Sequence, residues 1–482
     1  MAKNILIFSD GTGQIGGVRP DQKLSNIYKL YRATRPGPSS PIDPRQQFAF
    51  YDPGLGKGEV SGWTFKRTKH FLEATIGTGI DTNIIDCYEA VVAAYEPGDR
   101  ICVFGFSRGA YTVRALATVL NLCGVPTQLP NGSPMPKYGK TLRKIAREAV
   151  QEVYNHGAGK PRSEQPYFDQ REELGRRFRI RYGSSQNQDP AAPRGNVEPH
   201  FIGVFDSVAA LGSDKLKLLF SGALLTTVLF VVASFWFELH WAWKLLGLGS
   251  VAMVLGWLAH LARILLKSYS PIDKKLEIDL SEVSNSNLKK RSIHWAFWRT
   301  ANYDKYLSGE VNYARHAMAI DEERADFPRV KWGPTNTPTR RVDQVPRWLK
   351  QVWFAGCHSD IGGSYRESES RLSDIALSWM VQELQECVPE IVINNGLLQT
   401  FGDHRGLQHE ERWMSEAFRL AWKKKPRYVY EEGELHHSVF DRFEAGPVPI
   451  VDEIKYYRPE QLKTHNKLKE FYSCVDDDPN RP

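Results

Sequence analysis

A serine between two glycines stands where a short apolar run ends. The run that begins at Ile101 leads into Gly105-Phe-Ser107-Arg-Gly109, and a helical pattern follows over 110–122. A serine on a sharp strand-to-helix turn needs small neighbours, because side chains there would clash with the strained backbone. The N-terminus of the following helix favours developing negative charge. This spacing predicts a nucleophile elbow with Ser107 as the nucleophile.

A serine hydroxyl is a weak nucleophile unless a base, oriented by an acid, activates it. In hydrolases with such an elbow, the acid and then the histidine follow the serine along the chain. Asp206 ends the apolar run that starts at His200, and His358 ends the run that starts at Val352. Both lie at the carboxyl ends of expected strands, where open α/β sheets place their sites. We therefore expect a triad of Ser107, Asp206 and His358.

Other roles for the acid and the base stay open at this stage. Asp206 could instead cap a helix or a turn, and His358 could be a structural loop histidine. Asp360 and His437 form a substitute pair, because Asp360 also follows a strand and His437 lies later in the chain.

The oxyanion hole of such an enzyme uses two backbone N–H donors. One normally comes from the residue after the nucleophile, here Arg108, and the other from an early glycine-rich loop. Gly11 and Thr12 are placed to supply the second. The same loop resembles the aspartyl-phosphate motif, but Phe8 occupies the position of that motif's nucleophilic aspartate, which disfavours phosphotransfer.

The elements around these residues alternate short apolar runs with helical patterns, as in a mostly parallel sheet with crossover helices. The expected strands are 4–9, 100–106, 200–205 and 348–355, and the expected helices are 81–95, 110–122, 140–154 and 373–387. The predicted fold class is therefore an α/β-hydrolase-like sheet. The expected domains are a core of 1–212 with a surface insertion at 127–196, a hairpin at 213–270, a second core part at 271–390, and a weakly patterned region at 391–482.

Two long apolar stretches interrupt this core. Leu218–Phe237 holds no charged residue, and Leu245–Leu266 is broken only by His260 and Arg263. About 20 apolar residues are needed to cross a bilayer as a helix. The short aromatic connection between the stretches predicts a two-helix transmembrane hairpin, and the lysines and arginines that flank it predict that both termini are cytoplasmic. A pair of buried helices in a soluble domain is the alternative.

Composition narrows the function. Hydrophobic residues make up 41% and charged residues 25% of the 482 residues, which is ordinary for a globular protein. The net charge of +7 comes without a basic stripe interleaved with aromatics, which argues against nucleic acid; anionic lipid headgroups explain the excess equally well. The six cysteines show no metal-binding or disulfide spacing, so we expect no cofactor, no metal and a reducing compartment. No export signal is visible.

Six runs, in order between residues 4 and 390, resemble the catalytic domain of type VI secretion phospholipase effectors. The runs begin at Phe8 (Phe-Ser-Asp-Gly-Thr), Tyr51 (Tyr-Asp-Pro-Gly-Leu-Gly), Gly105 (Gly-Phe-Ser-Arg-Gly-Ala-Tyr), Gly203 (Gly-Val-Phe-Asp-Ser-Val), Ala314 (Ala-Arg-His-Ala-Met-Ala-Ile-Asp-Glu-Glu-Arg) and Trp353 (Trp-Phe-Ala-Gly-Cys-His-Ser-Asp-Ile-Gly-Gly). The resemblance implies an α/β-hydrolase that acts on phospholipid esters through Ser107, Asp206 and His358. Phe205 stands where the family often has Trp, and the hairpin is the larger departure.

The sequence thus predicts a membrane-anchored serine hydrolase of lipid esters, phospholipase A-like in its chemistry, with membrane lipids as substrate. It predicts a two-pass protein of the inner membrane whose catalytic domain faces the cytoplasm. An esterase or thioesterase acting on a soluble substrate and a catalytically idle membrane scaffold are the alternatives. The sequence identifies no regulatory or oligomeric partner.

Overall fold

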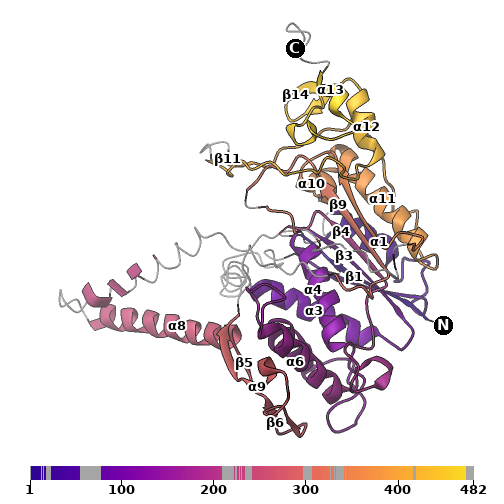
Figure 1. Ribbon diagram of the computed structural model, residues 1–482. Coiled ribbons are helices and arrows are strands. Elements are labelled where there is room, and N and C mark those ends of the chain that lie inside the picture. Colours follow the sequence, from indigo (N-terminus) through magenta and orange to yellow (C-terminus); the bar gives the residue numbers. More distant parts are fainter. Residues whose placement is uncertain are drawn as a thin grey trace.

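A six-stranded parallel sheet with helices on both faces forms the centre of the protein, as the computed structural model shows (Figure 1). The structure describes residues 2–11, 14, 16–17, 23–54, 78–208, 222, 225–226, 228–229, 231–233, 241–296, 307–325, 327–330, 332, 341, 343–415 and 420–473.

The strands of this sheet run in the order β10-β9-β4-β3-β1-β2, and every neighbouring pair is parallel. Their bounds are β1 Asn4–Ser9, β2 Gln47–Asp52, β3 Arg100–Phe106, β4 Phe201–Phe205, β9 Tyr313–Ala319 and β10 Leu349–Phe354. From β1 the chain continues to β2, which lies on one side of β1, and then to β3, which lies on the other side. Open α/β sheets bind ligands at such a switch point, outside the carboxyl ends of the strands.

Alternate residues of the strands face opposite helical layers. On β1, Ile5 and Ile7 belong to one buried cluster, whereas Leu6 and Phe8 belong to another. Both faces are apolar because both are covered, as is usual for parallel sheets. This explains why the sequence shows continuous apolar runs there rather than alternation.

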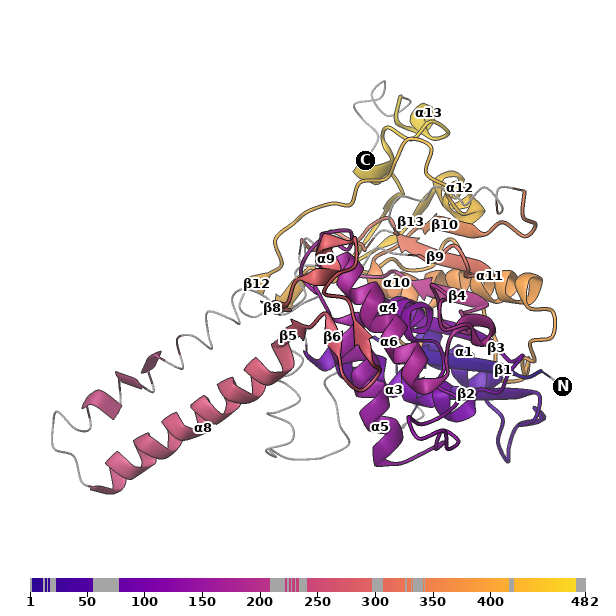
Figure 2. The same cartoon turned by 60° about the horizontal axis from the view of Figure 1, so that its bottom comes forward.

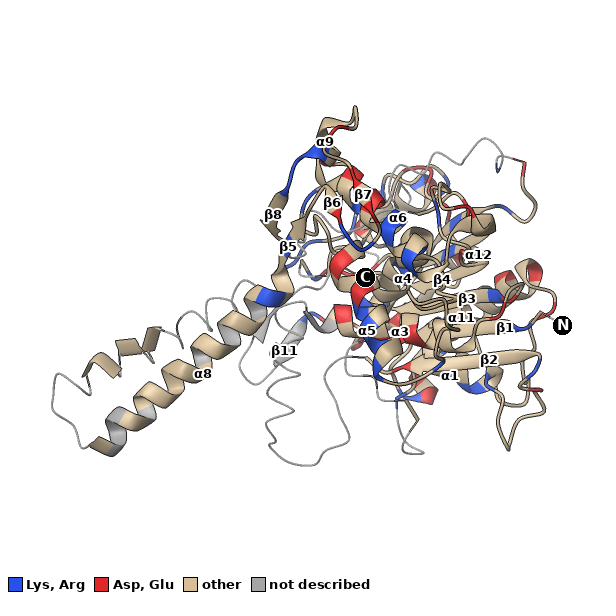
Figure 3. Cartoon of the chain, turned by 90° about the horizontal axis from the view of Figure 1, so that it is seen from below, with Lys and Arg blue, Asp and Glu red and all other residues tan. Residues whose placement is uncertain are grey.

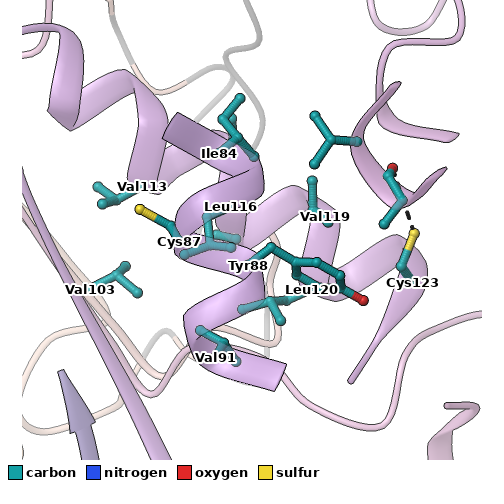
Figure 4. Packing of buried hydrophobic residues seen from close by; sticks show 14 of the residues in the cluster. Ile84, Cys87, Tyr88, Val91, Val103, Val113, Leu116, Val119, Leu120 and Cys123 are labelled. Carbon is teal, nitrogen blue, oxygen red and sulfur yellow. Dashed lines mark hydrogen bonds between the residues drawn. The ribbon is translucent and has the colours of Figure 1, made fainter. Parts of the chain in front are cut away.

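Two long helices cover the first face. These are α3 (Thr78–Ala94) and α4 (Arg108–Cys123), and Figure 4 shows their side chains packed together over β3. Tyr88 of α3 is buried there, and its hydroxyl donates to the carbonyl of Gly124 at the end of α4. The opposite face carries α1 (Asn26–Thr34) and α11 (Arg371–Cys387). The two helical layers hold the ends of β1 and β3 in fixed positions.

The segment 127–196 packs a further layer onto α4. It contains α5 (Lys140–Arg147), the π-helix η1 (Glu148–Tyr154) and α6 (Tyr167–Tyr182). Arg179 of α6 is buried and donates to the carbonyl oxygens of Leu122 and Ala192. The prediction found the first helix of this segment and missed α6, whose charged residues hide that it is half buried.

The region after residue 390 adds a small cluster at the β10 edge. Its elements are β11 (Trp413–Ser415), β12 (Leu420–Ala421), α12 (His437–Glu444), β13 (Pro447–Ile450), β14 (Glu453–Tyr456) and α13 (Lys469–Ser473). Phe443 and Val439 pack against Trp353 of β10. The N–H of Trp353 donates to the carbonyl of Glu434, which joins this region to the sheet.

Part of the predicted hairpin is described, as the long helix α8 (Trp241–Leu265), which projects from the body (Figure 2). Short elements follow it: β5 (Leu266–Tyr269), β6 (Ile272–Asp273), β7 (Ile278–Asp279), α9 (Ser286–Lys289) and β8 (Ser292–Trp295). Within the described part of the chain, no helix meets the length and apolarity of a membrane span. The transmembrane hairpin is therefore unsupported, and most of its first stretch, Leu218–Phe237, lies outside the described residues.

The predicted α/β class with a mostly parallel sheet is confirmed. The predicted strands 4–9 and 100–106 match β1 and β3 residue for residue. The prediction did not find α1, β2 or β9, because their apolar runs are short or mixed with polar residues. The predicted domain boundaries stay predictions.

Candidate active site

Ser107 occupies a strained turn between β3 and α4. Its φ of 58° and ψ of −121° lie in a region that residues with a side chain rarely adopt. A Cβ atom on Gly109 would overlap the carbonyl oxygen of Ser9, and one on Gly105 would overlap the backbone of Gly109 and Ala110. Both glycines of the motif are therefore required by close backbone approach, and the predicted elbow geometry is present.

The hydroxyl of Ser107 is not used to cap α4, although Ser107 is the N-cap residue. Its backbone N–H donates to the carbonyl of Phe205 over 3.2 Å, which fixes the turn against the end of β4. The residue is 6% exposed. The elbow is thus held next to Asp206, which follows Phe205 in the chain.

His358 and Asp206 form a buried pair at the same edge of the sheet. His358 Nδ1 lies 2.5 Å from Asp206 Oδ2. The imidazole stacks on the ring of Phe106, whose centroid is 4.7 Å away, and this brings it beside the elbow. The other ring nitrogen, Nε2, is buried and has no hydrogen-bond partner among the described residues. The histidine begins the short helix α10 (His358–Gly362), which follows β10 after a three-residue connection.

Asp206 is fully buried and is held on both oxygens. Its Oδ1 accepts from the N–H of Ala319 over 3.0 Å. The guanidinium of Arg427 binds both oxygens, with Nη2 2.9 Å from Oδ2 and Nη1 on Oδ1. Burial alone would raise the pKa of Asp206, but Arg427 and the hydrogen bond from His358 hold it well below its usual range. The carboxylate is therefore ionised at neutral pH.

The sequence did not reveal Arg427. It ends the basic run Lys423-Lys-Lys-Pro-Arg, which is typical of a solvated surface segment, and it lies 221 residues from Asp206. No periodicity links the two positions. Only the buried carboxylate at a strand end, which requires a cation or several donors, could have suggested that a distant arginine was needed.

Asp360 and His437 are not brought together as a substitute pair. Asp360 accepts from the N–H of Cys357 at the start of α10 and pairs with His409, whose Nδ1 lies 2.7 Å from Oδ1. His437 begins α12 and lies against the ring of His436, with centroids 4.0 Å apart. His409 was not singled out by the sequence, because it follows no apolar run.

The predicted oxyanion donors are only partly described. Arg108 is the first residue of α4, and Gly11 touches the elbow, since a Cβ atom there would lie 3.4 Å from Ser107 Cβ. The N–H of Gly11, however, donates to Asp10 Oδ1 over 2.7 Å. Thr12 lies outside the described residues. The oxyanion hole stays a prediction.

Asp10 anchors this loop beneath the elbow. Its Oδ2 accepts from Ser25 Oγ at 2.5 Å and from the hydroxyl of Tyr51 at 2.7 Å. Burial raises the pKa of Asp10 to about 6, although the three hydrogen bonds that it accepts lower it. Among the described residues, no group of three His, Cys, Asp or Glu side chains is arranged to hold a metal ion.

The arrangement defines a class: an α/β protein with a parallel sheet whose strained serine turn and buried histidine–aspartate pair share one edge of the sheet. The chain belongs to the family of Tle1-like phospholipase effectors of type VI secretion, because residues 3–235 and 281–383 match the model of that family's catalytic domain. The family membership expected from the sequence is thereby confirmed.

Two further comparisons name proteins without an assigned function. An uncharacterized protein of Saccharomyces cerevisiae, YEL023C, is 29% identical over 225 residues, which are 45% of this chain and 28% of that protein. The chain thus spans well under a third of that curated relative. A crystal structure of an uncharacterized protein from Pseudomonas aeruginosa is similar at 16% identity and a TM-score of 0.32, over 81% of this chain and 46% of that one.

Proposed function

We propose that the protein is a serine hydrolase that cleaves carboxyl esters of lipids, in the manner of a phospholipase A. The observation that carries the proposal is the strained Ser107 elbow next to the buried His358–Asp206 pair. A histidine oriented by a carboxylate through Nδ1 leaves Nε2 to act on a serine. The membership in a phospholipase effector family supports the lipid substrate.

In the proposed reaction, His358 Nε2 takes the proton of Ser107 Oγ while that oxygen attacks the ester carbonyl carbon. The tetrahedral intermediate collapses, the carbon–oxygen bond to the alcohol breaks, and the imidazolium returns its proton to the alcohol oxygen. Water then hydrolyses the acyl-enzyme by the same steps and releases the fatty acid. Asp206 keeps the imidazole in the correct tautomer and stabilises the imidazolium.

Attachment to a membrane is a second part of the proposal. Apolar side chains of α8 are exposed, with Trp241 and Met253 each 65% and Leu255 59% accessible. Figure 3 shows the helix free of charge over most of its length, with a basic stretch near β5. Exposed apolar surface of this extent marks a lipid or protein contact. A location at the inner membrane with cytoplasmic termini stays within this proposal.

The hydrolase is tested with a fluorophosphonate probe and mixed phospholipid vesicles. Wild-type protein should be labelled and should release free fatty acid, and Ser107→Ala should do neither. Ser359→Ala, which removes a neighbouring serine of α10, serves as the matched control and should keep both signals. Labelling of Ser107→Ala equal to the wild type would refute the nucleophile. Turnover of short soluble esters alone would favour the soluble-substrate alternative.

Membrane attachment is tested by flotation of the protein with vesicles of anionic phospholipid. Wild-type protein should float with the lipid, and a Met253→Asp, Leu255→Asp double variant should float less. Equal flotation of the two proteins would contradict the role of α8. The hydrolase proposal would be unaffected by that outcome.

A further inference from the structure

Asp206, the buried aspartate beside His358, is paired with Arg427, which lies outside the residues that match the family's catalytic domain. That match ends at residue 383, and Arg427 lies 44 residues further along the chain. The contact therefore joins the proposed catalytic centre to a segment beyond the residues that match the family's catalytic domain. This raises the question of what the segment does for the site.

Residues 422–430, here named the C-terminal strap, are fixed by backbone contacts across the site. The N–H of Ala325 donates to the carbonyl of Lys423 over 2.9 Å, and the N–H of Lys425 donates to the carbonyl of Glu323 over 2.7 Å. Trp422 packs edge-on against Phe327, and Phe327 packs edge-on against the imidazole of His358. The strap is thus anchored directly beside the histidine.

The guanidinium of Arg427 is pinned in one orientation. Besides both oxygens of Asp206, it binds the carbonyl of Ala319 at 3.2 Å and that of Phe327 at 3.3 Å. The side chain is only 7% exposed. The paired N–H groups of a guanidinium fix the plane of a carboxylate and also neutralise its charge. A lysine would supply the charge without fixing the plane.

The charge of Arg427 also offsets the negative charge of Asp206. A buried carboxylate needs a counter-charge or several hydrogen-bond donors, and the guanidinium supplies both. Other charged and titratable groups face the pair: Glu322, which accepts from the backbone N–H of His358, and Arg329, Arg324 and His316. Arg427 is the cation that contacts Asp206 directly.

We propose that Arg427 is a positioning residue that orients Asp206 toward His358 and balances its charge, so that the activity of the proposed hydrolase depends on the C-terminal strap. This inference rests on the proposed function. It assigns a role in the reaction to a segment beyond the matched catalytic domain.

The test compares Arg427→Met and Arg427→Lys with a control on the same strap, Lys424→Met, whose side chain is 54% exposed and pairs with Glu323. The measurement is kcat and KM for a 4-nitrophenyl ester, with thermal unfolding to show that each variant is folded. Arg427→Met should lose about tenfold to a hundredfold in kcat with little change in KM, because Asp206 acts on His358 and not on the bound ester.

Arg427→Lys should lose only several-fold in kcat, because the charge remains although the paired N–H groups are gone. Lys424→Met should behave as the wild type. A folded Arg427→Met whose kcat equals that of the wild type, or whose loss lies mainly in KM, would overturn the inference, since a general disturbance of the site would weaken substrate binding as well. If Arg427→Met does not fold, Arg427→Lys decides: a rate equal to the wild type would overturn the inference.

These outcomes are separable from a failure of the proposed function. If the wild-type protein is not labelled at Ser107 by the fluorophosphonate probe, the serine hydrolase itself is wrong. If Ser107 is labelled and Arg427→Met matches the wild type in kcat, only the role of Arg427 is wrong.

Discussion

Two histidine–aspartate pairs lie near the carboxyl edge of the sheet, and they differ in their surroundings. In each pair a histidine Nδ1 contacts a carboxylate, at 2.5 Å for His358–Asp206 and at 2.7 Å for His409–Asp360. The ring of His358 stacks on Phe106 beside the elbow. The ring of His409 lies flat against Tyr365, with centroids 3.6 Å apart, and its Nε2 lies 3.9 Å from a Glu369 carboxylate oxygen.

The two aspartates also differ in their hydrogen-bond partners. Asp360 accepts from the backbone N–H groups of Cys357 and His409, so it closes the first turn of α10 and ties a loop to it. Asp206 accepts one backbone N–H and otherwise meets side chains, those of His358 and Arg427. A histidine–aspartate contact is therefore not enough to mark a catalytic site. The position of the second ring nitrogen and the counter-charge of the carboxylate distinguish the two pairs.

Removal of the two histidines should separate the pairs most strongly. His358→Ala should lower kcat/KM by roughly a thousandfold or more, because the proposed general base is lost. His409→Ala should keep most of the activity and instead lower the free energy of unfolding by about 1–2 kcal/mol, because a partly buried hydrogen bond and a ring stack are lost. Ester hydrolysis and urea unfolding of both variants measure this. Similar activity losses in two folded variants would contradict the distinction.

The aspartates give the next largest contrast. Asp206→Asn should reduce kcat by about a thousandfold, because the amide cannot stabilise the imidazolium and favours the wrong tautomer. Asp360→Asn should change kcat little and should cost about 1 kcal/mol of stability through the weakened cap of α10. Steady-state kinetics with matched circular dichroism spectra test this. An inactive, folded Asp360→Asn beside an active Asp206→Asn would reverse the assignment.

The sequence predicted the parts of this site that local patterns encode. Ser107, Asp206 and His358 each follow an apolar run, and the parallel strands β3, β4 and β10 bring these ends to one edge. Partners that come from loops could not be found this way. Arg427 and His409 reach the site through segments without periodicity, so their roles depend on long-range packing.

The glycine-rich loop at Gly11, expected to supply an oxyanion donor, shows the same limit of prediction from sequence. The glycine-rich pattern singled out Gly11, which lies close to the elbow, since a Cβ atom built on it would be 3.4 Å from Ser107 Cβ. The pattern did not predict that the N–H of Gly11 would be engaged by Asp10, or that Ser25 and Tyr51 would converge on that carboxylate. Such convergence depends on α1 and β2, which the sequence analysis did not find.

The smallest predicted effect is on the pH dependence of stability, to which Asp10 and Asp206 contribute in opposite directions. The folded pKa of Asp10 is raised to about 6, so the unfolded chain loses this proton first as pH rises, and stability falls between about pH 4 and 6. The pKa of Asp206 is depressed, so its stabilisation is present at neutral pH and is lost as pH falls below its usual range. In the wild type, the raised pKa of Asp10 should lower the free energy of unfolding by about 2 kcal/mol over that window, and Asp10→Asn should abolish this decrease.

Urea unfolding of the wild type and of Asp10→Asn at pH 4.5 and 6.5, roughly the ends of this window, measures the effect. Asp189→Asn, which changes an exposed turn residue, is the control and should follow the wild type. Parallel pH dependence of all three proteins would show that Asp10 does not titrate in the way proposed.

The late position of Arg427 has a consequence for synthesis. A chain that is still on the ribosome can complete β10 and present Ser107, Asp206 and His358 before residue 427 has been made. In that interval Asp206 would be a buried carboxylate without its guanidinium, which disfavours a stable arrangement of the edge. Nascent chains should therefore hold Asp206 and His358 in their final arrangement only after residue 427 has left the ribosome, so the proposed hydrolase would stay latent until that point of its synthesis.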